Sequence, residues 1–443
     1  MASTSLSRNT WGTATNDKIF TMSVWVKRSG LGYQQIVNSY DGSTGNDNQL
    51  KFQSTDAVEL TVSTSGAEYF LKTNRLFRDT SAWYHIVFAF DSTQATSSDR
   101  YKLYVNGTQE TSFSSVSYPP QNTTYQFFRN SNANNIGSQF GASGGFFNGS
   151  MTHFHFIDGT AYDATAFGQY DANGVWTIKT SPSVTYGTNG FFILKNGNSV
   201  TDQSGNSNNW TVAGGTLTNT EDCPSNVFNT MTALAKSSVV TLKDGGCTTV
   251  GNSLGSAGKC RSNWNIPQSG KWYCEYKMIA DNQGNTYPNS GIRYNAETFS
   301  NPDNSPPDIF VYGTYGSELI HVNNGTNITA GAPASSGDIF GWCIDMDNGA
   351  IYIHQNGTYI NSGNPTSGAS KTGAIYTYTP SDYSNMCFVS WEFGNSETQW
   401  NFGNGYFSTT AVASAGTNAS GNGIFEYDVP TGFTALSTKG LNL

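Results

Sequence analysis

Charged residues are scarce in this 443-residue chain, where they make up 12% of the sequence, roughly half the usual share. Acidic residues outnumber basic ones by 31 to 22, which gives a net charge of −9. This is the wrong sign for a protein that neutralises phosphates, so we expect no nucleic-acid partner. The chain has no long apolar run, and its start, MASTSLSRNTWGT, has no apolar segment. We therefore expect neither export nor membrane insertion.

Closely spaced cysteine pairs are also missing. The six cysteines all lie in the second half of the chain, at positions 223, 247, 260, 274, 343 and 387. None forms a Cys-x-x-Cys pair, which excludes a zinc ribbon or a thioredoxin-like site. Because no export signal is expected, we interpret the cysteines as reduced and mostly buried thiols, with a structural disulfide as the alternative.

Glycine and aromatic residues are abundant instead. The chain has 48 glycines, and 14% of its residues are aromatic. Glycine disfavours long helices and supplies turns, whereas aromatic and β-branched residues favour strands. Disordered chains are poor in aromatic residues, so disorder is excluded. The composition predicts an all-β protein.

Alternating apolar residues predict two consecutive β-sandwiches. We expect an N-terminal segment at 1–18, a first sandwich at 19–195, a polar linker at 196–230 and a second sandwich at 231–443. Segments such as WYHIVFAFD (83–91) are typical of central strands, whereas the linker is almost entirely small and polar. No repeat of 20 to 50 residues is visible, which excludes a solenoid or a propeller.

A hairpin dominates the second half. The segment GDIFGWCIDMDNGAIYIHQNGTYI (337–360) predicts a strand, an Asn-Gly turn, a second strand and a further Asn-Gly turn. Strand parity predicts one set of core-facing side chains: Phe340, Trp342, Ile344 and Met346. Asp345 and Asp347 are expected not to share that face.

Several segments resemble known families. FTMSVWVKRSG, then WYHIVFAFD with LYVNGTQ, and finally GSMTHFHFIDGTAYDATAFG resemble a concanavalin A-like domain of laminin G type. GKWYCEYKM, the hairpin and QWNFGNGYF are similar to SPRY domains. The linker resembles the connector of tail-fibre and other virion surface proteins of marine bacteriophages, in which this pair of sandwiches occurs. The resemblance implies two sandwiches of these types, exposed on a virion.

Catalytic signatures are weak. The concanavalin-like fold also carries glycosidases, which need two carboxylates beside the scissile bond, but the pattern E-x-D-x-E is absent. Glu392 and Glu397 are the closest pair, and an odd separation of five residues predicts opposite faces of one strand. G-x-S-x-G occurs around Ser143 and Ser253, but that motif needs a strand-to-helix turn in an α/β fold. We expect a protein that is not an enzyme.

Two candidate metal sites remain. His153 and His155 are two apart on a predicted strand, so they share a face and could bind a metal, although polar residues of a half-exposed strand are the better interpretation. The loop 41–48 holds the oxygen donors that calcium prefers: Asp41, Asn46, Asp47 and Asn48. Laminin G-type domains often hold calcium at a rim loop, but these residues are also ordinary turn formers. Calcium is therefore a weak candidate, and no other cofactor is expected.

Aromatic residues near glycine and asparagine loops are candidates for stacking on sugar rings. They are Tyr33, Tyr40, Tyr312, Tyr315 and Trp391. The alternative for each is a place in a sandwich core. Asp41 and Asp47 complete the set of candidate ligand-binding residues.

The combined hypothesis is a phage virion surface protein, a tail fibre or capsid appendage, that attaches to the host through glycan binding. The alternatives are a capsid decoration protein that binds only virion partners and a glycan depolymerase. Since avidity favours several copies, we expect a homo-oligomer, with a trimer favoured. It would be anchored by the N-terminal ~15 residues or the first sandwich.

Overall fold

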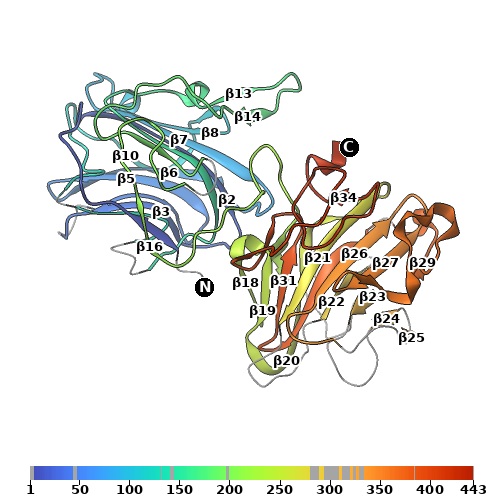
Figure 1. Cartoon of the computed structure of the whole chain (residues 1–443). Helices are drawn as coiled ribbons and strands as arrows, with labels where there is room; N and C mark the ends of the chain where they lie inside the picture. Colours follow the sequence, from blue (N-terminus) through green and yellow to red (C-terminus); the bar gives the residue numbers. More distant parts are fainter. Residues whose placement is uncertain are drawn as a thin grey trace. The chain divides into compact units, whose positions relative to one another are not determined.

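The computed structural model describes residues 4–42, 47–130, 132–139, 144–195, 199–279, 289–293, 309–311, 320–322, 326–328, 334–383 and 385–442. The chain divides into two compact units, Met1–Asn219 and Thr220–Leu443 (Figure 1). Within the described ranges the only helical segments are short 3-10 turns: Ser97–Asp99, Ala164–Ala166, Asp244–Gly246, Ile360–Ser362, Pro365–Ser370, Pro380–Asp382 and Gly440–Asn442. The all-β prediction is confirmed.

The first unit is a sandwich of two antiparallel sheets. The eight-stranded sheet has the order β10 (Phe113–Ser117), β6 (Ala67–Leu76), β5 (Ala57–Thr64), β4 (Asp47–Phe52), β3 (Gln34–Tyr40), β11 (Ala133–Ile136), β1 (Ser5–Ser7) and β16 (Thr211–Gly214). The six-stranded sheet has the order β15 (Phe191–Ile193), β12 (Gly149–Asp158), β2 (Ile19–Arg28), β7 (Trp83–Asp91), β8 (Tyr101–Val105) and β9 (Thr108–Glu110).

Apolar side chains from both sheets meet in one core. Leu50 and Leu60 of the eight-stranded sheet and Met22 and Phe88 of the six-stranded sheet are fully buried there. The other face of the six-stranded sheet is also covered, because Phe167 and its neighbours pack on it beside the short ribbon of β13 (Gly168–Tyr170) and β14 (Trp176–Ile178). Both faces of β7 are therefore buried, as the apolar run of this strand predicts.

The ends of the first unit differ from the expected boundaries. The division between the units falls at Asn219, inside the segment predicted as a linker, but much of that segment belongs to the first sandwich. Trp210 is buried in the core, and β16 pairs with β1. The predicted N-terminal segment is likewise part of the fold, since β1 pairs with β11 and Trp11 packs at 5.8 Å from Trp210 between ring centroids.

The second unit is a second sandwich. Its seven-stranded sheet has the order β17 (Met231–Lys236), β20 (Ser253–Asn265), β30 (Cys387–Gly394), β22 (Asn289–Arg293), β23 (Ile309–Val311), β24 (Ile320–Val322) and β25 (Thr326–Ile328). The nine-stranded sheet has a central path of β18 (Val240–Lys243), β19 (Thr248–Gly251), β31 (Glu397–Asn401), β21 (Lys271–Ile279), β26 (Ile339–Asp345), β27 (Ala350–Gln355) and β28 (Thr358–Tyr359). Outside this path, β29 (Tyr376–Thr377) pairs with β27, and β34 (Thr434–Ala435) pairs with β21; β32 (Tyr406–Phe407) and β33 (Thr410–Ala411) form a separate hairpin.

The predicted hairpin of the second unit is β26 and β27, and its parity is confirmed. The expected side chains lie in the core between the sheets: Phe340, Trp342, Ile344 and Met346. Asp345 points to the other face, where it pairs with Lys271 at 3.0 Å. That face is covered by C-terminal residues, including Phe425 and Phe433. All six cysteines are free thiols, and all but Cys223 are buried, as expected.

Candidate functional site

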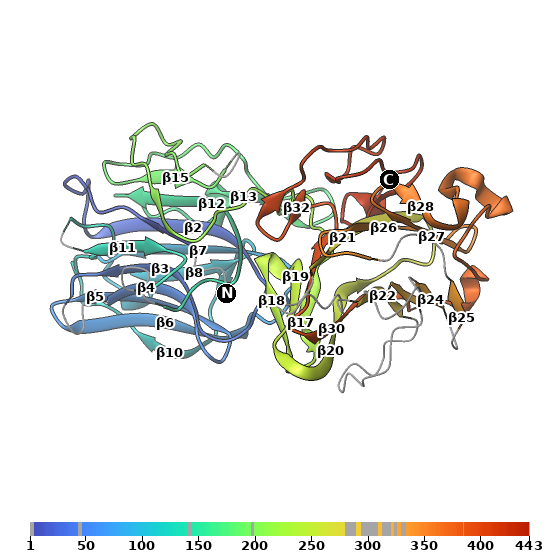
Figure 2. The same cartoon turned by 60° about the horizontal axis from the view of Figure 1, so that its bottom comes forward.

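Polar side chains cover one face of neighbouring strands β3, β4 and β5, which lie side by side in the eight-stranded sheet (Figure 2). Cross-strand pairing places Tyr40 opposite Asp47, Asn38 opposite Gln49, and Lys51 opposite Gln35 and Glu59. Since paired residues share a face and successive residues alternate, this face is the one turned away from the core that holds Leu50 and Leu60. We call it the outer polar face; its members are Gln35, Asn38, Tyr40, Asp47, Gln49, Lys51, Glu59 and Thr61.

The side chains of the outer polar face are linked to one another. Asp47 accepts a hydrogen bond from Asn38 Nδ2 at 2.5 Å and another from the Gln49 amide. Lys51 Nζ donates to Gln49 Oε1 at 2.8 Å and forms an ion pair with Glu59 at 3.2 Å. Burial raises the pKa of Asp47 to about 6. These contacts hold each group in a defined orientation.

Tyr33 stands at the edge of this face and is its most accessible aromatic side chain, with 37% of its surface exposed. Its hydroxyl donates to Gln35 Oε1 at 3.0 Å. Burial, together with the negative charges of Asp47 and Glu59, raises the pKa of Tyr33 to about 12. The residue therefore presents a neutral phenol, with a flat apolar ring and a polar edge.

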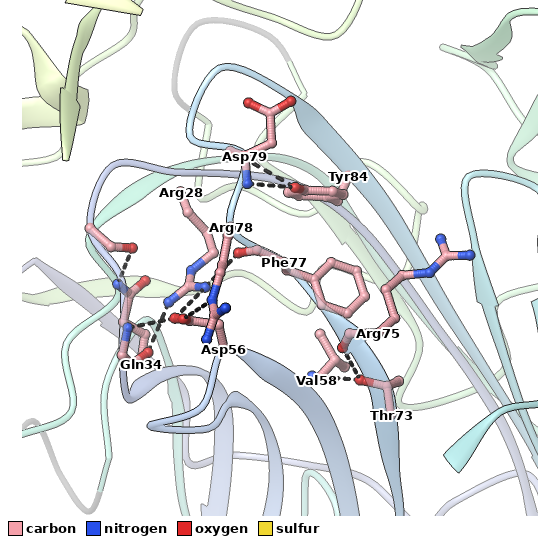
Figure 3. Close-up of polar contacts among 12 residues, drawn as sticks. Arg28, Gln34, Asp56, Val58, Thr73, Arg75, Phe77, Arg78, Asp79 and Tyr84 are labelled. Atoms are coloured by element: carbon pink, nitrogen blue, oxygen red, sulfur yellow. Dashed lines mark hydrogen bonds and ion pairs between the residues drawn. The ribbon is translucent and has the colours of Figure 1, made fainter. Parts of the chain in front are cut away.

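A buried ion pair fixes the loop that carries Tyr33 (Figure 3). Arg28 is fully buried and pairs with Asp56 at 3.0 Å between Nη1 and Oδ1. Gly32 is held from both sides, because its carbonyl accepts from Arg28 Nη2 at 2.8 Å and its N–H donates to Asp56 Oδ1 at 2.7 Å. Gly32 has φ +87°, a conformation that favours glycine. The position of the next residue, Tyr33, thus depends on two side chains from other strand ends.

The electrostatics of this pair follow from its partners. Burial lowers the pKa of Arg28, although Asp56 opposes the shift. Burial would raise the pKa of Asp56, but the Gly32 N–H, Arg78 and Arg28 together hold it below its ordinary value. Arginine stays protonated in proteins, and the lowered pKa of Asp56 keeps its carboxylate ionised at neutral pH, so an ion pair clamps the loop.

The structure brings together only part of the predicted ligand-binding set. Tyr33, Tyr40 and Asp47 belong to the outer polar face. Asp41 is exposed at the end of β3. Trp391 is half-buried on β30 of the other unit, opposite Lys259. Tyr312 and Tyr315 lie outside the described residues.

The candidate calcium loop is described only at its ends. Asn46 lies outside the described residues. Asn48 is fully buried, and its side chain bonds to the backbone of Ser63. Asp47 is engaged by two amides rather than facing an open rim. In the part of the chain that the structure describes, no group of three histidine, cysteine or acidic side chains could hold a metal ion.

The interpretation of His153 and His155 as half-exposed residues is wrong. Both are buried, because the segment that carries Tyr186 and Phe192 covers them; the His155 and Phe192 rings stack with centroids 3.9 Å apart. Burial lowers the pKa of His153 to about 4 and that of His155 well below its ordinary value. His153 Nδ1 contacts Thr152 Oγ1 at 2.9 Å. The pair is neutral at pH 7.

The weak catalytic candidates lie in structural positions. Glu392 and Glu397 are not on one strand, as the spacing suggested, but on β30 and β31, joined by a turn. Glu392 is fully buried and accepts from Thr249 Oγ1 at 2.7 Å, whereas Glu397 contacts Lys243 at 3.7 Å. Ser253 begins β20 directly after β19, so its motif lies between two strands. Ser143 lies outside the described residues.

Glu275 is the centre of a second carboxylate network, which the sequence did not predict. Glu275 on β21 is fully buried and accepts from the backbone N–H groups of Glu426 at 2.8 Å and Tyr427 at 2.9 Å. Tyr273 donates to the same carboxylate at 2.9 Å and contacts His354 Nε2 at 2.7 Å. Burial raises the pKa of Glu275 to about 7. This network fastens the C-terminal segment to the sheet.

Lys51 and Glu59 were not predicted as site residues from the sequence either. Both are polar residues at alternating positions, in QLKF and AVELTV, and this alternation is the available signal. Their proximity depends on the register between β4 and β5, which a single strand does not reveal.

Comparison with known proteins bears on the fold of each unit. Residues 3–166 match the family model of the concanavalin A-like lectin/glucanases superfamily, so the first sandwich is of the expected concanavalin A-like type. Solved structures similar to part of the chain include the SPRY domain of human HERC1, with 13% identity over 38% of this chain and 96% of that chain at a TM-score of 0.28. A human SPRY domain has 13% identity and a TM-score of 0.28, with 37% of this chain and 95% of that chain covered. Stonustoxin has 13% identity and a TM-score of 0.27, with 39% of this chain and 27% of that chain covered. Likenesses of this size carry no argument about function.

A search of curated proteins finds no match. No helix among the described residues is long and apolar enough to cross a membrane.

Proposed function

We propose that the protein binds carbohydrate through the outer polar face of its first unit and serves host attachment on a bacteriophage virion. One observation carries the binding proposal: the exposed ring of Tyr33 bonds to Gln35 at the edge of a face on which the paired Lys51 and Glu59 side chains each stay 13% exposed, while Gln35, Asn38, Asp47 and Gln49 are buried. The virion location rests on the resemblance of the sequence to phage surface proteins. No specific observation favours the decoration protein over an attachment protein.

The chemistry of the face suits a sugar. A pyranose offers an apolar C–H face, which stacks on an aromatic ring such as Tyr33. Its hydroxyls both donate and accept, so they pair with groups such as Lys51 and Glu59. The contacts among these side chains already restrict their rotamers, which reduces the entropy lost on binding.

We propose that the protein binds the glycan without cleaving it, and the contacts of its acidic side chains support this form of the proposal. A glycosidase needs one protonated carboxyl and a second carboxylate free to act as base or nucleophile. The acidic groups of the face are engaged otherwise: Asp47 holds two amides, and Glu59 holds Lys51 and accepts from Thr61 at 3.3 Å. We therefore propose that the purified chain releases no reducing ends from host polysaccharide.

Attachment through weak sugar contacts gains from several copies, and we propose a homotrimer. Because β1 and Trp11 are part of the first sandwich, we place the anchor on a surface of that sandwich. The mass of the native oligomer, together with immunogold labelling of particles at the tail or the capsid, tests this arrangement.

A glycan array tests the binding site itself. We expect Tyr33→Ala to weaken binding at least tenfold, since the stacking platform is lost. The matched control is Tyr170→Ala, because Tyr170 is 53% exposed but lies on β13, away from the outer polar face. An array on which the chain binds nothing, or equal binding by both variants, would refute the proposal.

A further inference from the structure

Arg78 is an exposed arginine anchored by a buried carboxylate. Its Nε donates to Asp56 Oδ2 at 3.0 Å, and its side chain remains 55% exposed, whereas the Asp56 side chain is 7% exposed. The close-up shows the guanidinium of Arg78 beside Asp56, which also contacts Arg28 (Figure 3). One carboxylate thus serves two guanidinium groups, and the three residues together carry a net charge of +1.

The terminal amino groups of Arg78 have no acceptor among the described residues, since its contacts there are confined to Nε. The nearest acidic neighbour in sequence, Asp79, is engaged by Ser81, whose N–H and hydroxyl donate to Asp79 Oδ1 at 2.8 and 2.6 Å. Arg75, on the same segment, is paired with Glu110 at 3.1 Å. Arg75 is therefore held in the same way as Arg78, through Nε alone, and what distinguishes Arg78 is that its partner Asp56 also binds the N–H of Gly32, the residue before Tyr33.

The same carboxylate links Arg78 to the candidate sugar platform. Asp56 Oδ2 accepts from Arg78, and Asp56 Oδ1 accepts from the N–H of Gly32, the residue before Tyr33. The anchored guanidinium and the exposed ring therefore lie at the same end of the first sandwich. Their relative position is set by one buried group.

We propose that Arg78 binds the anionic group of an acidic sugar, a carboxylate or a sulfate, while Tyr33 stacks on the glycan. This inference rests on the proposed function and names its ligand class. Two parallel N–H donors of a guanidinium match the two oxygens of such an anion, and anchoring through Nε removes much of the side-chain freedom that binding would otherwise restrict. An acidic protein would then bind an acidic receptor through one local positive group.

The test is a glycan array that carries uronic, sialic, sulfated and neutral glycans, probed with the full chain. We expect the wild-type protein to bind acidic glycans, and Arg78→Gln to reduce that binding about tenfold without changing the binding of neutral glycans. Arg78→Lys keeps the positive charge but not the two parallel N–H donors, so we expect a partial loss of binding to acidic glycans. Arg75→Gln is the matched control, since Arg75 has a similarly exposed side chain and is also held through Nε, but by Glu110 rather than by the carboxylate that binds Gly32.

The outcomes separate the two proposals. If binding to carboxylated glycans depends on Arg78, the ligand is of uronic or sialic type. If binding to sulfated glycans depends on Arg78, the ligand is sulfated. Binding confined to neutral glycans, or acidic spots that Arg78→Gln and Arg75→Gln weaken equally, would overturn the inference while leaving sugar binding intact. Binding to no glycan at all would refute the proposed function and the inference with it. Unchanged thermal unfolding of Arg78→Gln shows that the loop still folds.

Discussion

Glu275 should make the stability of the second unit fall as the pH rises. In the folded protein its pKa is about 7, whereas the unfolded value is near 4.5. The folded state therefore retains a proton between these values that the unfolded state has released, and stability decreases across pH 4.5–7. A difference of about 2.5 pKa units corresponds to about 3 kcal/mol.

Other buried groups titrate in the same range, so the comparison must be made against a variant. Burial lowers the pKa of His354 to about 4 and thereby makes stability rise with pH from about 4 to 6.5, the opposite sign. Glu275→Gln removes the titration of Glu275 and leaves the other titrating groups, including His354, in place. The variant loses one carboxylate oxygen, so one of the N–H groups of Glu426 and Tyr427 loses its acceptor.

The assay is urea unfolding of wild type and Glu275→Gln at several pH values, with hydrogen exchange of the peptide 424–430 to assign the transition to the C-terminal segment. We expect the wild type to lose about 3 kcal/mol relative to the variant between pH 4.5 and 7. Parallel curves would show that the donors around Glu275, the N–H groups of Glu426 and Tyr427 and the Tyr273 hydroxyl, keep its pKa near the ordinary value, and the expectation from burial would then be wrong.

Two further predictions concern stability. Trp342→Ala should lower the free energy of unfolding of the second unit by about 3 to 5 kcal/mol, because Trp342 is fully buried in the core. The control Leu234→Ala, at a residue 60% exposed, should change it by no more than about 0.5 kcal/mol. Urea unfolding compares the two variants, and an unchanged stability of the Trp342 variant would contradict the placement of the hairpin. Asp56→Asn should lower the free energy of unfolding of the first unit by about 3 to 5 kcal/mol, because Arg28 is left buried without its counter-charge. Calorimetry measures the loss. A change below about 1 kcal/mol would show that another group compensates the charge of Arg28.

The sandwich architecture was predictable because the strands that build it are long enough to show a period of two. In β26 the alternation of Phe340 and Trp342 with polar or small neighbours set the core face correctly. The shorter strands β1 and β16 have only three and four residues, too few for a period to be visible. Trp11 and Trp210, each isolated among polar residues, were the remaining signs that these segments belong to the core.

The candidate site was predictable only where it comes from one segment. Tyr33, Tyr40 and Asp47 lie on the stretch that folds into β3 and β4, so their proximity follows from a hairpin. Glu59 joins them through the register of another strand. The histidines were misinterpreted for a related reason: whether His155 is exposed depends on Phe192, which is supplied by a later strand and is invisible in the alternation of β12 itself.

Asp56 shows why the rest of the site could not be predicted. It lies 28 residues from Arg28 in the sequence, in a turn where an aspartate is an ordinary residue. In the fold it fixes the Gly32 loop, neutralises one buried arginine and anchors one exposed arginine. A substitution of Asp56 would therefore change stability and binding together. Tyr33 and Arg78 are both exposed and are tied to Asp56 through Gly32 and through Nε respectively, so their substitution separates the binding role from the structural one.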